Sequence, residues 1–310
     1  MTLDPIPLFF AAGLTAGLLK VDLRFPGGLH DGLSLFLLLA LGLKGGEGLA
    51  QTPGAALLGP SLAAMGLALG LPLLAFGWLR ALRYSREDAG ALAAHYGSVS
   101  VGTFAVAQAY LLAQGFPVEP ALAFCLVLME SPALMVGVVL ARGGQRRGLG
   151  RELLREVVLS KPIFLLATGL AIGALTPAAG LQPLEPLFHG LFKGVLCLFL
   201  LEMGVAAAQR LAGLKERAPS LLAFGLLMPL IGGALGVVFG HLAGLGVGGS
   251  AVLGALGASA SYIAAPATAR AAIPTANPAL YLTASLGITF PFNVLLGVPL
   301  YTALAQKVAS

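Results

Sequence analysis

Long apolar stretches separated by short polar ones run through the whole sequence. A helix of about 20 apolar residues crosses the hydrocarbon core of a bilayer, so we expect ten membrane-spanning helices. Their approximate ranges are 5–19, 29–50, 55–79, 88–113, 119–141, 157–175, 187–208, 218–243, 248–272 and 278–305. These stretches lack the alternation of apolar and polar residues that a transmembrane β-barrel requires. The pattern therefore predicts an all-α polytopic membrane protein.

The composition supports this interpretation and excludes several classes of protein. The chain is 58% hydrophobic and only 10% charged, and its mean hydropathy is +0.93. Soluble domains carry about 25% charged residues, so this chain cannot cover itself with a polar surface. That excludes a soluble enzyme, a disordered regulator and a nucleic-acid-binding domain. The 43 glycines are typical of membrane helices that approach each other closely.

The basic residues indicate an orientation in the membrane. Most of the 18 Lys and Arg residues lie in the connections after the first, third, fifth, seventh and ninth spans. Basic connections stay on the cytoplasmic side, so both termini are expected outside. The net charge of +5 follows from this pattern and does not indicate a nucleic-acid partner. No positively charged segment precedes the first apolar stretch, so we expect that span to be retained.

Segments of the two halves resemble each other at nearly one spacing. LLLALG at 37–42 resembles FLLEMG at 199–204, Ser98-x-Ser100 recurs as Ser259-x-Ser261, and Pro132 recurs as Pro291. A copied unit of five spans enters the membrane from the opposite face, because five is odd. The result is an inverted repeat, which is common among secondary transporters. We expect a first five-helix repeat at 1–141, a basic cytoplasmic linker at 142–156 that forms a short surface helix, and a second, inverted repeat at 157–310.

Two spans at corresponding places are interrupted by small and polar residues. They read HYGSVSVGT at 95–103 and GASASYIAAPAT at 257–268, and we expect the second helix to break near Pro266. Backbone freed from a helix inside a bilayer must line a cavity or be buried in protein. Paired broken helices indicate a binding site at the midplane, where half-helix N-termini attract an anion and free carbonyls coordinate a cation. The alternative is that Ser and Gly only allow close helix packing.

Glu130 is an ionisable residue in the middle of an apolar span, followed by Ser131 and Pro132. It is a candidate to ligate a cation or carry a proton; the alternative is a hydrogen-bonded structural carboxyl. The sequence has no phosphate-binding ATPase motif, no metal-ligand spacing of His and Cys, and no Ser–His spacing that selects a protease pair. We expect a transporter that is not an enzyme and has no cofactor.

Five segments carry a resemblance to a known family. The chain resembles the sodium-dependent bicarbonate transporter superfamily, the SbtA-like permeases. The segments are LLLALGLKGG at 37–46, GSVSVGT at 97–103, LMESPALMVGVVLA at 128–141, FKGVLCLFLLEMG at 192–204 and ASASYIAAPATARAAIPTANPALY at 258–281.

The resemblance implies both an architecture and an activity. It implies two inverted five-helix repeats of the bile-acid-symporter type, in which broken helices 4 and 9 cross and a core bundle moves against a gate bundle. It also implies a homotrimer in the bacterial inner membrane that imports bicarbonate with Na⁺ as the coupling ion, by alternating access. A PII-like cytoplasmic regulator is a further implied partner.

The resemblance also implies the site. Substrate contacts are expected from Ser98, Ser100, Gly102, Thr103, Ser259, Ser261, Tyr262, Ile263 and Ala264. Cation contacts are expected from Gly97, Ser100, Thr103, Glu130, Ser131 and Ser261. The sequence departs from the family pattern at Tyr262, where an aspartate is usual, at Gly102, where a serine is usual, and at Glu130-Ser131, where Asp-Ile is usual. Transport of another small anion or carboxylate with proton coupling through Glu130, or passive anion conduction, are the alternatives.

Overall fold

The computed structural model describes residues 5–23, 25–119, 122–143, 160–212 and 218–310, and within these ranges every regular element is a helix. The first part of the chain forms α1 (Pro5–Leu18), α2 (Leu29–Gln51), α3 (Gly54–Ala81), α4 (Arg86–Gly97), α5 (Val101–Ala113) and α6 (Leu122–Ala141). The second part forms α8 (Lys161–Leu175), α9 (Ala178–Leu181), η1 (Gln182–Leu184), η2 (Pro186–Gly190), α10 (Phe192–Ala212), α11 (Ala218–Leu242), α12 (Val247–Gly257), α13 (Ala264–Ala272), α14 (Pro278–Leu282), η3 (Thr283–Thr289), α15 (Phe290–Phe292), η4 (Asn293–Gly297) and α16 (Val298–Ala309).

Many of these helices are long and apolar enough to cross a bilayer. By length and composition, six described helices qualify: Leu29–Gln51, Gly54–Ala81, Leu122–Ala141, Phe192–Leu211, Pro219–Leu242 and Pro278–Ala309. Three further described helices are apolar but shorter: Pro5–Leu18, Lys161–Leu175 and Val247–Gly257. The chain is therefore a multi-pass, all-helical membrane protein.

Two expected spans are broken into half-helices, as the polar interruptions suggest. One break, at Ser98–Ser100, separates α4 from α5, and the other, at 258–263, separates α12 from α13. The second break precedes Pro266, which lies in the first turn of α13. A proline is tolerated there because the first N–H groups of a helix have no partner within the helix. Pro132, by contrast, lies inside the uninterrupted helix α6.

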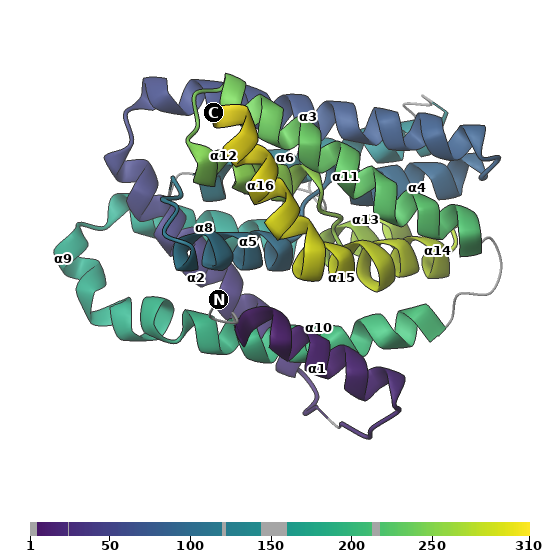
Figure 1. The fold of residues 1–310 in the computed structure, drawn as a ribbon, viewed down its shortest axis with the longest axis horizontal. Coiled ribbons are helices and arrows are strands. Elements are labelled where there is room, and N and C mark those ends of the chain that lie inside the picture. The colour runs from purple at the N-terminus through teal and green to yellow at the C-terminus, as the bar shows by residue number, and fades with distance from the viewer. Residues whose placement is uncertain (1–4, 24, 120–121, 144–159, 213–217) are drawn as a thin grey trace.

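The helices form two groups. α1 packs against α10 and α2 against α8, and Figure 1 shows α1 and α10 side by side along the bottom of the view. In the second group, α3 packs against α4, α6 and α11, while α11 packs against α12 and α16. Figure 1 shows α3 and α11 along the top, opposite α1 and α10. The broken helices belong to this second group.

Glycines bring α2 and α8 into backbone contact. Gly42 and Gly46 on α2 meet Gly169 and Gly173 on α8, and both pairs have the four-residue spacing of close membrane-helix packing. A Cβ at Gly46 would collide with the carbonyl oxygen of Leu170. The packing is therefore set by backbone atoms, which cannot move aside as a flexible side chain can.

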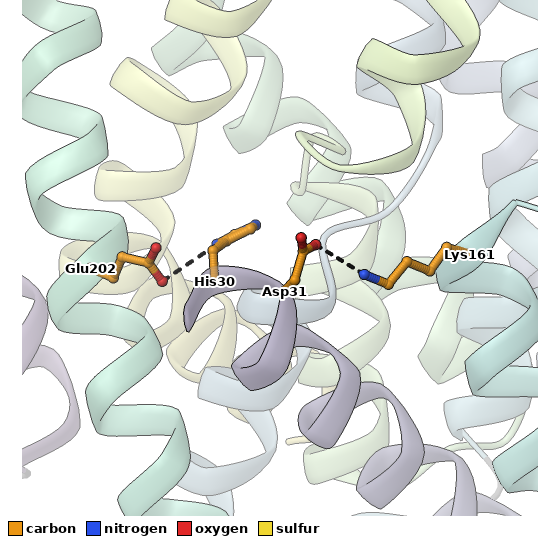
Figure 2. Close-up of polar contacts among 4 residues, drawn as sticks. All are labelled: His30, Asp31, Lys161 and Glu202. Atoms are coloured by element: carbon orange, nitrogen blue, oxygen red, sulfur yellow. Dashed lines mark hydrogen bonds and ion pairs between the residues drawn. The ribbon is translucent and has the colours of Figure 1, made fainter. Parts of the chain in front are cut away.

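Ionisable side chains connect the start of α2 to both of its neighbours (Figure 2). The Lys161 Nζ atom of α8 lies 2.9 Å from Asp31 Oδ1, and Glu202 Oε2 of α10 lies 3.5 Å from His30 Nδ1. The His30 ring also stacks on Phe199 of α10, with ring centroids 5.8 Å apart. These contacts fix one end of α2 between α8 and α10.

The expected surface helix in the linker 142–156 lies outside the described residues, except for its first two positions. Arg142, one of these two, donates from Nε and Nη2 to the carbonyl oxygen of Ala272, at 3.1 and 2.9 Å. Ala272 ends α13, where a positive side chain satisfies free carbonyls and complements the helix dipole. The end of α6 is thereby attached to the second broken helix.

We predict that Gly46→Ala destabilises the protein by about 1–3 kcal/mol, because the added Cβ meets backbone on α8. The matched control is Gly70→Ala on α3, where nothing lies within 4 Å of an added Cβ. The control should keep or slightly raise the melting temperature, because alanine favours a helix over glycine. Thermal unfolding of the detergent-purified variants measures both effects. Equal melting temperatures for the two variants would contradict the packing argument.

Candidate functional site

The two helix breaks touch each other at the centre of the second helix group. The backbone N–H of Ser261 donates to the carbonyl oxygen of His95 at 2.9 Å. The backbone N–H of Ser100 donates to the Ser259 hydroxyl at 3.0 Å. Backbone groups freed by one break are thus satisfied by the other, as the membrane interior requires. The structure brings the two Ser-x-Ser motifs together.

The second serine of each motif caps the half-helix that follows. The Ser100 hydroxyl accepts from the Thr103 N–H at 3.1 Å, and the Ser261 hydroxyl accepts from the Ala265 N–H at 3.2 Å. We call the place where the two breaks, 98–100 and 258–263, touch each other the crossing. Helices α5 and α13 therefore begin at the crossing, and α4 and α12 end beside it. Helix N-termini carry partial positive charge and C-termini partial negative charge. Both an anion and a cation can find favourable dipoles here.

A small cavity of about 10 Å³ lies at the crossing. Its lining residues are Val99, Ser100, Val101, Glu130, Pro162, Ser261, Tyr262 and Ile263. Glu130 comes from α6 and Pro162 from the first turn of α8, so the cavity lies where the two helix groups meet. Such a cavity holds about one water molecule. A monovalent metal ion is of similar size, whereas an anion of four heavy atoms requires the helices to separate.

Polar atoms without a hydrogen-bond partner gather around this crossing. Within the described residues they include Ser98 Oγ, Thr103 Oγ1, His95 Nε2 and Glu130 Oε2. None of these side chains is more than 2% exposed. Buried polar atoms are nearly always paired, because leaving them unpaired costs free energy. A group of unpaired polar atoms at one place is typical of an ion-binding site, because these atoms can bind the ion.

Tyr262 and Gly102 fit each other. A Cβ at Gly102 would collide with the Tyr262 hydroxyl and would lie 3.1 Å from ring carbons of Phe199 and Phe290. The Tyr262 ring meets Phe290 edge to face, with centroids 4.9 Å apart, and its hydroxyl lies beside that of Ser100. Gly102 therefore makes room for Tyr262, so the residues at these two positions depend on each other.

The other expected residues differ in their placement. Ile263 lines the cavity, whereas Ala264 is the buried first residue of α13. Gly97 is packed against Pro72 and Ala133. Ser131 is half-buried beside Glu130 and is not among the residues lining the cavity. Glu130, Ser100 and Ser261 are thus the expected cation residues that meet at the cavity.

The sequence analysis missed Asn293, which supports the second break. This fully buried residue lies in η4 and donates from Nδ2 to the carbonyl oxygen of Ala258 at 2.9 Å. Its Oδ1 accepts from the Tyr301 hydroxyl at 2.9 Å. An amide in the middle of the apolar stretch FPFNVLLG is a signal that could have drawn attention to it.

We predict that Gly102→Ala lowers the melting temperature, because the new Cβ meets the Tyr262 hydroxyl. Adding Tyr262→Phe removes the oxygen and should restore much of the stability. The pair should therefore show a coupling of about 1–3 kcal/mol in a double-mutant cycle. The measurement is thermal unfolding of the wild type, both single variants and the double variant. Strictly additive effects would show that the two positions do not depend on each other.

Comparison with known proteins agrees with the sequence motifs. The sequence profile of the Na⁺-dependent bicarbonate transporter superfamily matches residues 5–306. No curated protein matches the sequence. The profile spans all the described helices up to α16, including both breaks and Glu130. The chain belongs to the Na⁺-dependent bicarbonate transporter superfamily.

Proposed function

We propose that this protein is a secondary active transporter that imports bicarbonate together with sodium by alternating access. The observation that carries the proposal is the direct contact between the two Ser-x-Ser breaks, beside a cavity lined by Glu130. Membership of the family supplies bicarbonate and sodium as the transported pair. The chain itself acts as a transporter and not as an enzyme.

The cavity suits the cation. Ser100 and Ser261 offer hydroxyl oxygens and Glu130 offers a carboxylate, and a hard cation such as Na⁺ prefers oxygen ligands. In the proposed site the anion binds next to the cation, at the N-termini of α5 and α13. The residues proposed to surround the anion come from both breaks and the half-helices that follow them. They are Ser98, Gly102 and Thr103 on one side, and Ser259, Tyr262, Ile263 and Ala264 on the other.

Electrostatics favours coupled binding of the two ions. Import of one anion against an inside-negative potential costs about 2.3 kcal/mol per 100 mV, and one accompanying cation cancels this cost. Each ion also supplies the opposite charge that the other requires in a poorly solvated site. We therefore expect each ion to raise the affinity for the other by the same factor.

We propose that the α3–α6 and α11–α16 group is the core that moves against a gate formed by α1, α2, α8 and α10. Support comes from the cavity, because Pro162 of the gate group covers residues of the core group. The pairing of helices supports an inverted repeat of 1–141 and 157–310. The first helix of each half, α1 or α8, packs against the second helix of the other half, α10 or α2.

Ten spans with both termini outside are proposed from the apolar stretches and from the distribution of Lys and Arg. A place in the bacterial inner membrane, a homotrimer and a PII-like cytoplasmic regulator are proposed from the family alone.

Glu130 supports one second candidate function, the transport of a small anion or carboxylate coupled to protons, because a buried carboxyl can carry a proton through the cycle.

We predict saturable, sodium-dependent uptake of labelled bicarbonate into proteoliposomes. Uptake driven by an inward sodium gradient should exceed uptake in potassium at the same pH. The half-saturating concentration of either ion should fall as the other rises. Uptake that does not saturate would indicate passive conduction, and equal uptake in sodium and potassium would contradict sodium coupling.

We predict that Glu130→Gln raises the half-saturating sodium concentration at least about tenfold, because the isosteric amide removes the charge that faces the cation. A tenfold change corresponds to about 1.4 kcal/mol. Ser131→Ala is the matched control on the same helix and should leave sodium dependence unchanged. The measurement is the initial uptake rate as a function of sodium at several pH values. An unchanged sodium dependence with a lost pH dependence would favour proton coupling instead.

A further inference from the structure

A second, larger pocket of about 470 Å³ lies between α1, α5 and α10. Its lining residues are Pro5, Ile6, Phe9, Ala109, Ala113, Gln114, Lys193, Gly194, Cys197 and Leu198. Two of these helices belong to the proposed gate and one, α5, is a half-helix of the first broken span. The pocket therefore lies on the same boundary between helix groups as the crossing cavity.

The pocket and the crossing cavity lie at different levels along α5, whose first residue, Val101, lines the cavity. Ala109, on the pocket wall, is seven residues beyond Gly102 on α5, which is about 10 Å along a helix. At the level of Gly102, the nearest side chains are the rings of Phe199 on α10, Tyr262 and Phe290. Tyr262 also lines the crossing cavity. We infer that these three rings, Phe199, Tyr262 and Phe290, form an aromatic barrier between the two spaces.

The charge of the pocket is positive. Among the described residues that line it, Lys193 alone has a charged side chain, and within this part of the chain Lys193 forms no ion pair. Lys44 of α2 lies close enough to Lys193 for the two positive charges to interact. The Lys44 Nζ atom is 4.0 Å from the centre of the Phe192 ring. The carboxylate that acts on Lys44, Glu47, lies 3.6 Å from His189 Nε2.

We propose that this pocket is a vestibular binding site for a small monovalent inorganic anion, which Lys193 attracts before the anion passes the aromatic barrier. Gln114 adds amide hydrogens that can donate to the anion. Lys193 is exposed at the edge of the pocket, and a positive group beside a cleft raises the local concentration of an anion and its association rate. The inference rests on the proposed function for the identity of the anion. The proposed topology places the pocket on the outer side of the membrane.

Cys197 on the pocket wall allows a direct test without transport. In a Cys125→Ala background it is the only cysteine, and it can be modified by methanethiosulfonates of similar size and opposite charge. The negatively charged sulfonatoethyl reagent should react faster than the positively charged trimethylammonioethyl reagent. Lys193→Gln should lower this rate ratio about three- to fivefold, and Lys193→Glu should invert the preference. High salt should reduce the wild-type ratio by screening.

Lys307→Gln is the matched control, because it removes the same charge from an exposed site at the end of α16. It should leave the rate ratio unchanged. A ratio that does not respond to Lys193→Gln would overturn the proposal, and so would a Cys197 that reacts with neither reagent, because the pocket would then be closed to water.

Uptake measurements separate this inference from the proposed function. In proteoliposomes, Lys193→Gln should raise the KM for bicarbonate about three- to fivefold at low ionic strength and leave kcat unchanged, whereas Lys307→Gln should change neither. If the protein moves no bicarbonate but the Lys193-dependent labelling ratio persists, the vestibular anion site stands and the proposed substrate fails. If bicarbonate uptake is normal and the ratio does not depend on Lys193, the proposed substrate stands and the site fails.

Discussion

Every backbone polar group that a broken helix exposes inside a bilayer must find a partner within the protein, and the rest of the structure depends on this constraint. The two breaks meet it largely by pairing with each other, through Ser261 with His95 and Ser100 with Ser259. Asn293 satisfies the carbonyl group of Ala258 next to the second break. A single broken helix would leave such groups unpaired, so the breaks stabilise the fold only as a crossing pair.

Close backbone contact is the second requirement of this arrangement. The glycines of α2 and α8 bring two helices of the proposed gate into backbone contact, and Gly102 leaves room for Tyr262 at the crossing. The polar side chains around the crossing are paired only in part, since Ser98, Thr103, His95 and Glu130 each keep an unpartnered atom. The bound ions of the proposed cycle offset that cost, which links stability of the site to its occupancy.

Much of the fold could be predicted from the sequence because membrane spans are set by local hydropathy. The polar interruptions also located both breaks, and the repeated Ser-x-Ser motif indicated that the breaks correspond. What the sequence could not give depends on three-dimensional contacts. A break was expected near Pro266, but a proline can begin a helix as well as end one, so the exact position of the break at 258–263 could not be derived. Gly97 was expected as a cation contact, and its packing against Pro72 and Ala133 could not be seen in the sequence. The fit between Gly102 and Tyr262 joins positions 160 residues apart, which no local pattern reveals.

The closed cavity and the aromatic barrier together constrain how a transport cycle can proceed. Pro162 of α8 lines the cavity, and Tyr262 lines it on the side of the inferred aromatic barrier. Each of these two boundaries pairs a residue of the proposed gate with residues of the proposed core: Pro162 lies at the crossing, and Phe199 lies against Gly102. A rigid movement of one helix group past the other can therefore loosen one of these boundaries while tightening the other, without unfolding either break. In such a cycle the pairing between the Ser-x-Ser motifs stays intact, and the boundary between the groups supplies the alternation of access.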